Sequence, residues 1–173
     1  MVKSLAAILR YSIKGGEVVS LKDELHIIRS YLSIQNIRFG SRFEYSMNIQ
    51  PEAENLMIPR MCLQPLVENA FVHGLENKLS DGLLTITATI ETDELVIAVR
   101  DNGVGMTAEK TAELNQLIRQ AGMDQPPAAH GVGLINVARR IQIDRGNAFG
   151  MLIESTLNEG MSVTLRLPIK KEI

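Results

Sequence analysis

The sequence predicts an α+β domain in which three helices cover one face of a mixed, mostly antiparallel sheet. Helical spacing of apolar residues recurs in several segments, whereas alternating, β-rich segments dominate the second half of the chain. Strands that follow one another closely along a chain usually pair, and short turns between them favour antiparallel pairing. At 173 residues and 45% hydrophobic, the chain can bury one core and carry a small helical appendage.

The beginning of the chain is predicted to be helical. Apolar residues within 2–12 have helical spacing, and a glycine pair at 15–16 ends this first helix. Ser20 is a predicted N-cap, because acidic residues follow it in the first turn. We expect the second helix to run to about Arg38 and to end at Gly40.

The rest of the chain alternates between strands and helices. Alternating or β-rich runs predict strands over 43–49, 83–91, 94–100, 150–155 and 162–168. Helical patterns predict helices starting at Pro65 and covering 108–121 and 132–145. Between these elements, 51–59 is expected to be a connection, and 122–129, which contains two prolines, a link without regular structure.

Composition excludes several classes of function. A formal net charge of −2 and only 4% aromatic residues give no basis for nucleic-acid binding. The single cysteine, Cys62, excludes an intramolecular disulfide, and its apolar neighbours predict a buried structural thiol. No apolar stretch approaches the ~20 residues that span a bilayer, and no signal peptide is visible. We therefore expect a cytoplasmic domain.

The segment from Asp101 to Met106 (DNGVGM) is the first candidate site. Asp101 follows a predicted strand, and its carboxylate could accept a hydrogen bond from an exocyclic amine. Gly103 and Gly105 have no side chains, so their backbone can approach a flat ring closely. The same pattern also occurs in ordinary tight turns, so this segment alone does not define a ligand.

Two further segments carry polar groups suited to a nucleotide. In residues 63–74 (LQPLVENAFVHG), Asn69 and His73 are four apart and project from the same side of a predicted helix. A carboxamide oxygen can ligate Mg²⁺, and an imidazole can contact a phosphate. In residues 130–141 (HGVGLINVARRI), a glycine-rich turn leads into a helix, whose free N–H groups suit a polyphosphate.

In order and content, the three segments resemble the N box and the two glycine boxes of the GHKL (Bergerat) ATP-binding fold. The longer strings LQPLVENAFVHG, DNGVGM and HGVGLINVARRI resemble the LytS/YehU-type sensor histidine kinases. So do LRYSI, VSLKDELHIIRSYLSIQNIRFG and the terminal GMSVTLRLP. The resemblance implies a two-layer α/β sandwich with an N-terminal helical segment. Neither glycine segment has the spacing of a P-loop or a Rossmann fingerprint.

The resemblance also implies roles for individual residues. Asp101 would recognise adenine, Asn69 would hold Mg²⁺, and His73 would direct a basic group toward the phosphates. Glu68 could act as a general base or support the metal shell, and these alternatives stay open. Further nucleotide contacts are implied at Gly103, Gly105, Met106, Gly131, Val132, Gly133 and Leu134.

The C-terminal part of the chain departs from the family wording. Relatives often have Gly-x-Gly-Thr where this chain has Asn158 to Met161 (NEGM). Ser162 or Thr164 is therefore expected to supply the hydroxyl that usually supports adenine. We also expect 107–130 to form a mobile lid that orders around a triphosphate, because its centre has almost nothing to bury.

The resemblance divides the chain into a helical linker, residues 1–40, and a GHKL catalytic domain, residues 41–173. It implies a histidine kinase that binds ATP and Mg²⁺ and donates the γ-phosphate to a histidine outside this chain, for a response regulator. The family's acceptor motif, similar to PHFLFN, is absent. Relatives are membrane-anchored homodimers, so the full-length protein is expected to be one too. The alternatives are an anti-sigma-type protein serine kinase and a nucleotide-binding interaction module without catalysis.

Overall fold

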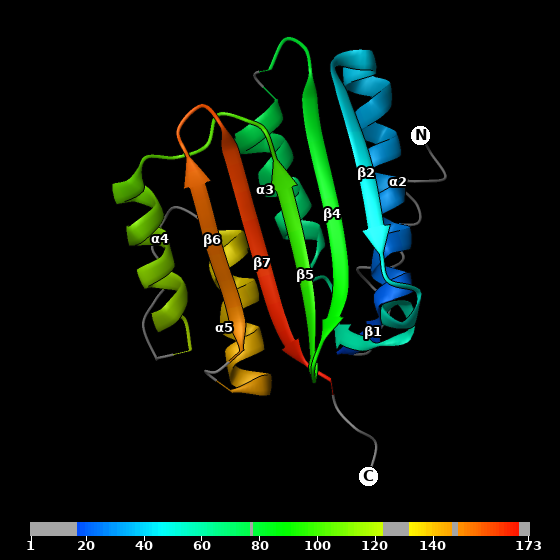
Figure 1. Cartoon of the computed structure of the whole chain (residues 1–173), viewed down its shortest axis with the longest axis vertical. Helices are drawn as coiled ribbons and strands as arrows, with labels where there is room; N and C mark the ends of the chain where they lie inside the picture. The colour runs from blue at the N-terminus through cyan, green and yellow to red at the C-terminus, as the bar shows by residue number, and fades with distance from the viewer. Residues whose placement is uncertain (1–16, 77, 123–131, 147–148, 170–173) are drawn as a thin grey trace.

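A computed structural model describes residues 17–76, 78–122, 132–146 and 149–169. Five strands form the main sheet in the spatial order β2-β4-β5-β7-β6 (Figure 1). β2 pairs in parallel with β4, and every other neighbouring pair is antiparallel, which confirms the predicted mixed sheet. The strands are β2 (Phe43–Ile49), β4 (Gly82–Glu91), β5 (Glu94–Asp101), β6 (Gly150–Thr156) and β7 (Gly160–Pro168).

The helices lie on one face of this sheet, behind it in the view of Figure 1. Their bounds are α2 (Leu21–Phe39), α3 (Gln64–Asn69), α4 (Ala108–Gln120) and α5 (Val132–Arg145). Helix α4 lies along the edge strand β6 and also contacts α5. Side chains of β5 and β7 alternate between the buried, helix-covered face and the open face. This two-layer arrangement confirms the predicted fold class.

Helix α2 begins and ends as the sequence predicts. The hydroxyl of Ser20 accepts a hydrogen bond from the backbone N–H of Asp23, and Gly40 ends the helix with φ 61°. Its inner face contributes fully buried side chains to the core of the sheet, namely Leu21, Leu25, Ile28 and Leu32. The described part of the predicted linker therefore packs as part of the domain. The predicted helix at 2–12 lies outside the described residues.

Several short elements of the fold were not predicted. Residues 51–59 contain a short 3₁₀-helix (Pro51–Asn55) and a strand, β3 (Met57–Pro59), which pairs antiparallel with β1 (Val18–Ser20). A second 3₁₀-turn (Gly40–Arg42) leads into β2. Strands of three residues are too short to show a period-2 pattern, so β1 and β3 could not be predicted from alternation.

Helix α3 continues without a break as a π-helix (Ala70–Leu75). The backbone N–H of Glu76, at the C-cap, donates to the carbonyl of Phe71 at 2.8 Å. Phe71 packs edge-to-face on Phe43, with ring centroids 4.7 Å apart. π-helical turns are rare and occur frequently at functional sites. Here the π-helix carries His73 and Gly74, two residues of the candidate site.

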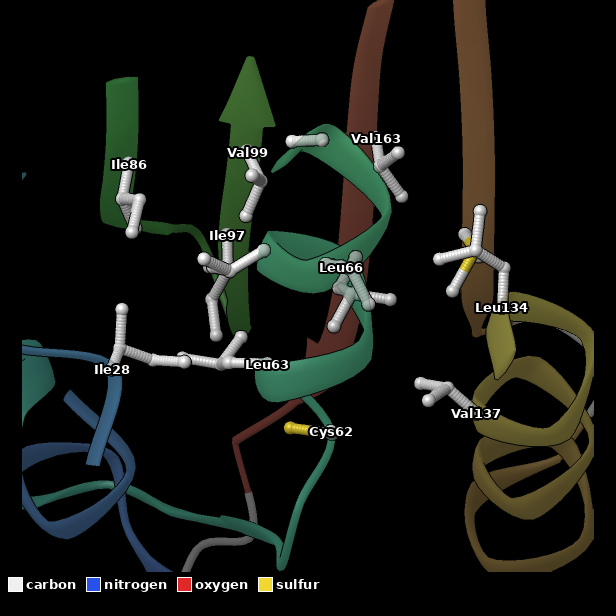
Figure 2. Packing of buried hydrophobic residues seen from close by; sticks show 14 of the residues in the cluster. Ile28, Cys62, Leu63, Leu66, Ile86, Ile97, Val99, Leu134, Val137 and Val163 are labelled. Atoms are coloured by element: carbon white, nitrogen blue, oxygen red, sulfur yellow. The ribbon is translucent and has the colours of Figure 1, made fainter. Parts of the chain in front are cut away.

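The core lies between the sheet and the helices. Figure 2 shows Ile28 of α2 pointing toward Leu63, and Leu66 between the sheet and α5. Cys62 is fully buried beside them, and burial raises the pKa of its thiol well above the ordinary value. The prediction of a buried structural thiol is confirmed. Among the helices of the described residues, none combines the length and the apolar composition that a membrane span needs.

Candidate functional site

A cavity of about 610 Å³ opens at one end of the sheet, between α4 and the α3–π-helix segment. Its size falls within the roughly 300–1,000 Å³ of small-molecule sites. Two of the three predicted segments, 63–74 and 101–106, reach it, because β5 ends there and α3 runs alongside. The lining residues are Asn69, His73, Gly74, Asp101, Gly105, Met106, Lys110, Glu113, Leu114, Leu117 and Met161.

Asp101 is the buried charged group of this cavity. It ends β5 and is 4% exposed, and its Oδ1 accepts a hydrogen bond from the backbone N–H of Gly103 at 2.8 Å. Burial raises the pKa of Asp101 from 3.8 to about 6. The N–H groups of Gly103 and Met161 and the nearby Lys78 ammonium oppose this shift. A partly desolvated acceptor of this kind suits a ligand that brings its own hydrogen-bond donor.

Glycines allow the backbone to close around Asp101. A Cβ built on Gly74 would lie 2.5 Å from Asp101 Oδ1, and one on Gly103 would lie 2.3 Å from the Gly74 backbone. The N–H of Val104 donates to the Gly74 carbonyl at 3.2 Å. The N box and the first glycine box therefore contact each other through backbone atoms alone. The role of Gly74 in this contact was not predicted, although Gly74 directly follows His73.

The first glycine box is also fixed to the β6–β7 hairpin. Asn158 N–H donates to the Val104 carbonyl at 2.7 Å, and Met106 N–H donates to the Ser155 hydroxyl at 2.9 Å. Gly105 has φ 57°, and Met106 follows it on the cavity lining. The structure thus places Gly105 and Met106 at the cavity, as the sequence predicts, and Gly103 directly behind them against Gly74.

Asn69 and His73 both line the cavity, on the same side as predicted. Asn69 is half-buried, and its Nδ2 donates to the thioether of Met161 at 3.6 Å. His73 is exposed. The structure therefore brings together a carboxylate, a carboxamide and an imidazole from two segments that are far apart in the sequence.

Glu68 does not join this group. Its Oε1 accepts a hydrogen bond from Gln64 Nε2 at 2.7 Å, one turn earlier on α3. Its charge adds to burial in raising the pKa of Tyr31 on α2. The described residues that line the cavity do not include Glu68. This placement gives no support to the predicted general-base role.

The strand register corrects the prediction for the adenine-supporting hydroxyl. In the β5–β7 ladder Asp101 pairs with Met161, so these two side chains share the buried face. Ser162 pairs with Arg100 and Thr164 with Ala98, which places both hydroxyls on the opposite, open face. Neither Ser162 nor Thr164 can therefore reach the cavity, and Met161 occupies the position beside Asp101.

Helix α4 forms a wall that was not predicted. The hydroxyl of Thr107 caps it, accepting from Lys110 N–H at 3.4 Å. Its cavity-facing residues have helical spacing and begin four residues after Met106: Lys110, Glu113, Leu114 and Leu117. That spacing, directly after the first glycine box, was the available signal. The first half of the predicted lid is thus a docked helix, and 123–130 lie outside the described residues.

The second glycine box is described only in part. Gly131 lies outside the described residues, as does His130 before it, and Val132 begins α5. Gly133 is exposed near the start of α5, whereas Leu134 is 2% exposed and belongs to the hydrophobic core. The Leu134 side chain therefore packs in the core rather than on the cavity.

The cavity is lined by glycines, lies over a buried carboxylate and adjoins a mixed sheet whose one face is covered by helices. Together these features define a class of nucleotide-binding domain. The family model described as histidine kinase-, DNA gyrase B- and HSP90-like ATPase matches residues 56–171, and a histidine kinase model matches residues 1–43. The chain therefore belongs to this ATPase family, as the ATP-binding catalytic domain of a sensor histidine kinase.

Individual relatives agree with this assignment. The chain is 31% identical to the sensor histidine kinase YesM of Bacillus subtilis over 100% of its own length and 28% of that protein. It is also 31% identical to the sensor protein kinase HptS of Staphylococcus aureus, over 99% of the chain and 32% of HptS. The chain thus spans about a third or less of these relatives. The predicted resemblance and the predicted ATP-binding function are confirmed.

Solved structures confirm the fold. The catalytic domain of histidine kinase ThkA superposes with a TM-score of 0.64 at 16% identity, covering 90% of this chain and 97% of that one. The histidine kinase domain of the blue-light activated kinase of Erythrobacter litoralis EL346 gives 0.60 at 15% identity, covering 97% and 72%.

Proposed function

We propose that the cavity binds Mg²⁺-ATP with adenine against Asp101 and the phosphates toward Asn69 and His73. The observation that carries this orientation is the gradient of burial along the cavity. Asp101 is 4% exposed, whereas His73 is exposed at the protein surface. The buried carboxylate suits the flat base and its exocyclic amine. The exposed imidazole suits a charged phosphate chain that must stay accessible to a second protein.

Mg²⁺ would enter with the nucleotide. Among the described residues, no group of three or more His, Cys, Asp or Glu side chains could hold a metal ion. Mg²⁺ is commonly bound by one or two protein oxygens together with substrate phosphates and water. The single carboxamide of Asn69 on the cavity fits that donor set. When bound, the ion would neutralise charge on the phosphates, which is most of what phosphoryl transfer requires.

The γ-phosphoryl group would pass from ATP to an imidazole nitrogen of a histidine outside this chain, and ADP would leave. The phosphohistidine would then donate the group to a response regulator. The domain by itself should bind nucleotide without phosphorylating itself. Glu68 has no step in this scheme, because its carboxylate is engaged with Gln64. The relatives' names support a sensor kinase. From the sequence resemblance, the full-length protein would act as a membrane-anchored homodimer.

Labelled ATP tests this proposal directly. The domain is incubated with Mg²⁺ and γ-labelled ATP, with and without a separate fragment that carries the acceptor helix. We expect acid-labile label on the fragment and none on the domain alone. Acid-stable label on a hydroxyl would indicate a protein serine kinase, and nucleotide binding without any transfer would indicate a non-catalytic module.

The metal role has its own test. Asn69→Ala should weaken Mg²⁺-ATP binding much more than binding of ADP without metal, because only the metal-bridged phosphates need the carboxamide. Calorimetric titration measures both affinities. Equal losses for the two ligands would mean that Asn69 acts through packing on Met161 and not through a metal ion.

A further inference from the structure

Glu24 is a buried carboxylate on α2, outside the nucleotide cavity. Its side chain lies in the first turn of the helix, and the residue is only 1% exposed. One carboxylate oxygen accepts from the backbone N–H of Met61 at 2.6 Å, and the other from that of Leu63 at 3.2 Å. Carboxylates that accept backbone N–H groups form the stronger class of hydrogen bond. A single side chain therefore joins α2 to the segment that precedes α3.

That segment determines where α3 begins. Leu63 is the N-cap residue of α3, and its own side chain makes no capping hydrogen bond. Its carbonyl accepts from the N–H groups of Leu66 and Val67, each at 3.1 Å. Met61, two residues earlier, has φ 55°, a left-handed conformation that non-glycine residues rarely adopt. Glu24 thus supplies from another helix an acceptor for the N–H of the α3 N-cap residue, and its second hydrogen bond fastens the unfavourable backbone of Met61.

The residues at the far end of this segment are those proposed to face the phosphates. Asn69 is the last residue of α3, and His73 follows in the π-helix. Leu63, Leu66 and Val67, which precede Asn69, are all 0% exposed, so one face of α3 is packed in the core. Ile28, four residues after Glu24 on α2, points toward Leu63 in Figure 2. A displacement of α2 would therefore be passed to α3 through both hydrogen bonds and packing.

We propose that Glu24 is a positioning residue that couples α2 to the phosphate end of the nucleotide site. Helix α2 lies within the region matched by the histidine kinase model, residues 1–43, whereas Met61 and Leu63 lie within the ATPase match, residues 56–171. Glu24 joins the two regions and sets Asn69 and His73 relative to Asp101. This inference rests on the proposed roles of Asn69 and His73.

The test compares two ligands on Glu24→Gln. The amide keeps one acceptor oxygen, but it turns an NH₂ group toward one of the two N–H donors. We expect the affinity for Mg²⁺-ATP to fall about tenfold, while the affinity for ADP without metal changes by less than about threefold. The NMR signals of the His73 imidazole should also shift in the nucleotide-free protein. A role in stability alone would move neither the ratio of affinities nor those signals.

Two matched variants serve as controls. Asp23→Asn removes the neighbouring, exposed carboxylate of the same turn and should leave the affinity ratio unchanged. Leu32→Val removes core packing farther along α2, so it should lower the melting temperature without changing the ratio. If Glu24→Gln does not fold, Glu24→Asp is measured in the same way. The shorter side chain keeps the charge but loses reach, and an intermediate loss is expected.

The outcomes separate this inference from the proposed function. A metal-selective loss in Asn69→Ala and in the Glu24 variant supports both. A metal-selective loss in Asn69→Ala together with equal losses for the two ligands in the Glu24 variant overturns the coupling alone. If Asn69→Ala shows no metal selectivity, the assignment of the phosphate end and the coupling that rests on it are both wrong.

Discussion

The two walls of the nucleotide cavity are held in place by different kinds of contact. On the sheet side, Gly74, Gly103 and Asp101 approach so closely that a Cβ on either glycine would overlap its neighbour. On the other side, the wall formed by α4 is attached by the amide side chains of Asn115 and Gln142. Backbone contact fixes the first wall, whereas side chains fix the second, namely the two amides and the buried Ile118 of α4.

The two amides hold α4 at separate places. Asn115 exchanges two hydrogen bonds with the backbone of Ile153 on edge strand β6, at 2.7 and 3.0 Å. Gln142 of α5 accepts from Gly122 N–H at 2.7 Å and donates to the Ile118 carbonyl at 2.9 Å. A rotation of either side chain would break its hydrogen bonds without breaking any helix, and α4 would then be held there by apolar packing such as that of Ile118. We therefore expect the adenine end of the site to be rigid, and α4 to be the wall that can shift.

Gly103→Ala should have the largest effect, because the rigid wall has no room for a methyl group. Its Cβ would lie 2.3 Å from the Gly74 backbone, so the N box and the glycine box must separate. We expect a loss of roughly 3 kcal/mol or more in unfolding free energy, together with loss of nucleotide binding. Urea unfolding and a nucleotide titration measure the two effects.

Gly133→Ala is the matched control for stability. Its Cβ would meet only Pro65 Cβ, at 3.7 Å, and the position lies within α5. Alanine in place of a helical glycine should raise stability by up to about 1 kcal/mol. Similar unfolding free energies for Gly103→Ala and Gly133→Ala would contradict the account of the rigid wall.

Gln142→Ala should have a smaller effect that is confined to the α4 wall. It leaves the Gly122 N–H and the Ile118 carbonyl without their partner, at a cost of about 1–3 kcal/mol. Hydrogen exchange should accelerate at Gly122 and the last turn of α4, whereas the amides around Asp101 keep their protection. Gln116→Ala, on the exposed side of α4, is the control. Faster exchange around Asp101 as well would show that the two walls are not independent.

The pH dependence of stability reports on the buried carboxylate and is the smallest of these effects. Burial raises the pKa of Asp101 from 3.8 to about 6. The folded state therefore binds this proton more tightly than the unfolded state, and the stabilisation is full below 3.8 and lost as pH rises through about 6. In nucleotide-free protein, the stability of the wild type relative to Asp101→Asn should fall between pH 4 and 7. A constant difference across that range would contradict the pKa assignment.

Much of the fold followed from local patterns. The Ser20 cap, the two-residue turn between β4 and β5 and the bounds of α5 agree with the predicted elements to within a residue or two. These features depend on residues close together in sequence, where capping and periodicity act. The positions of Asp101, Asn69 and His73 on one cavity were predicted from three segments considered together.

Contacts between distant segments could not be predicted in the same way. Glu24 binds a turn 37 residues away, and nothing in its own neighbourhood distinguishes it from a surface carboxylate. In the π-helix after Asn69, Phe71 likewise packs on Phe43, which lies far from it in the sequence. The error at Ser162 and Thr164 was avoidable, since the alternation of Val163, Leu165 and Leu167 already places Met161 on the buried face.

The proposed function depends on recognition of adenine by Asp101, and a titration of two nucleotides on two proteins tests this recognition. Non-hydrolysable analogues of ATP and of its 6-oxo counterpart, inosine triphosphate, are titrated with Mg²⁺ into the wild type and Asp101→Asn. The wild type should prefer the adenine analogue, because only adenine presents an amine to the carboxylate. Asp101→Asn should lose about ten- to a hundredfold in affinity for it. The variant should bind the inosine analogue at least as well as the wild type does, because an amide can donate to the 6-oxo group. Equal preference ratios in the two proteins would contradict the assignment of Asp101 to the base.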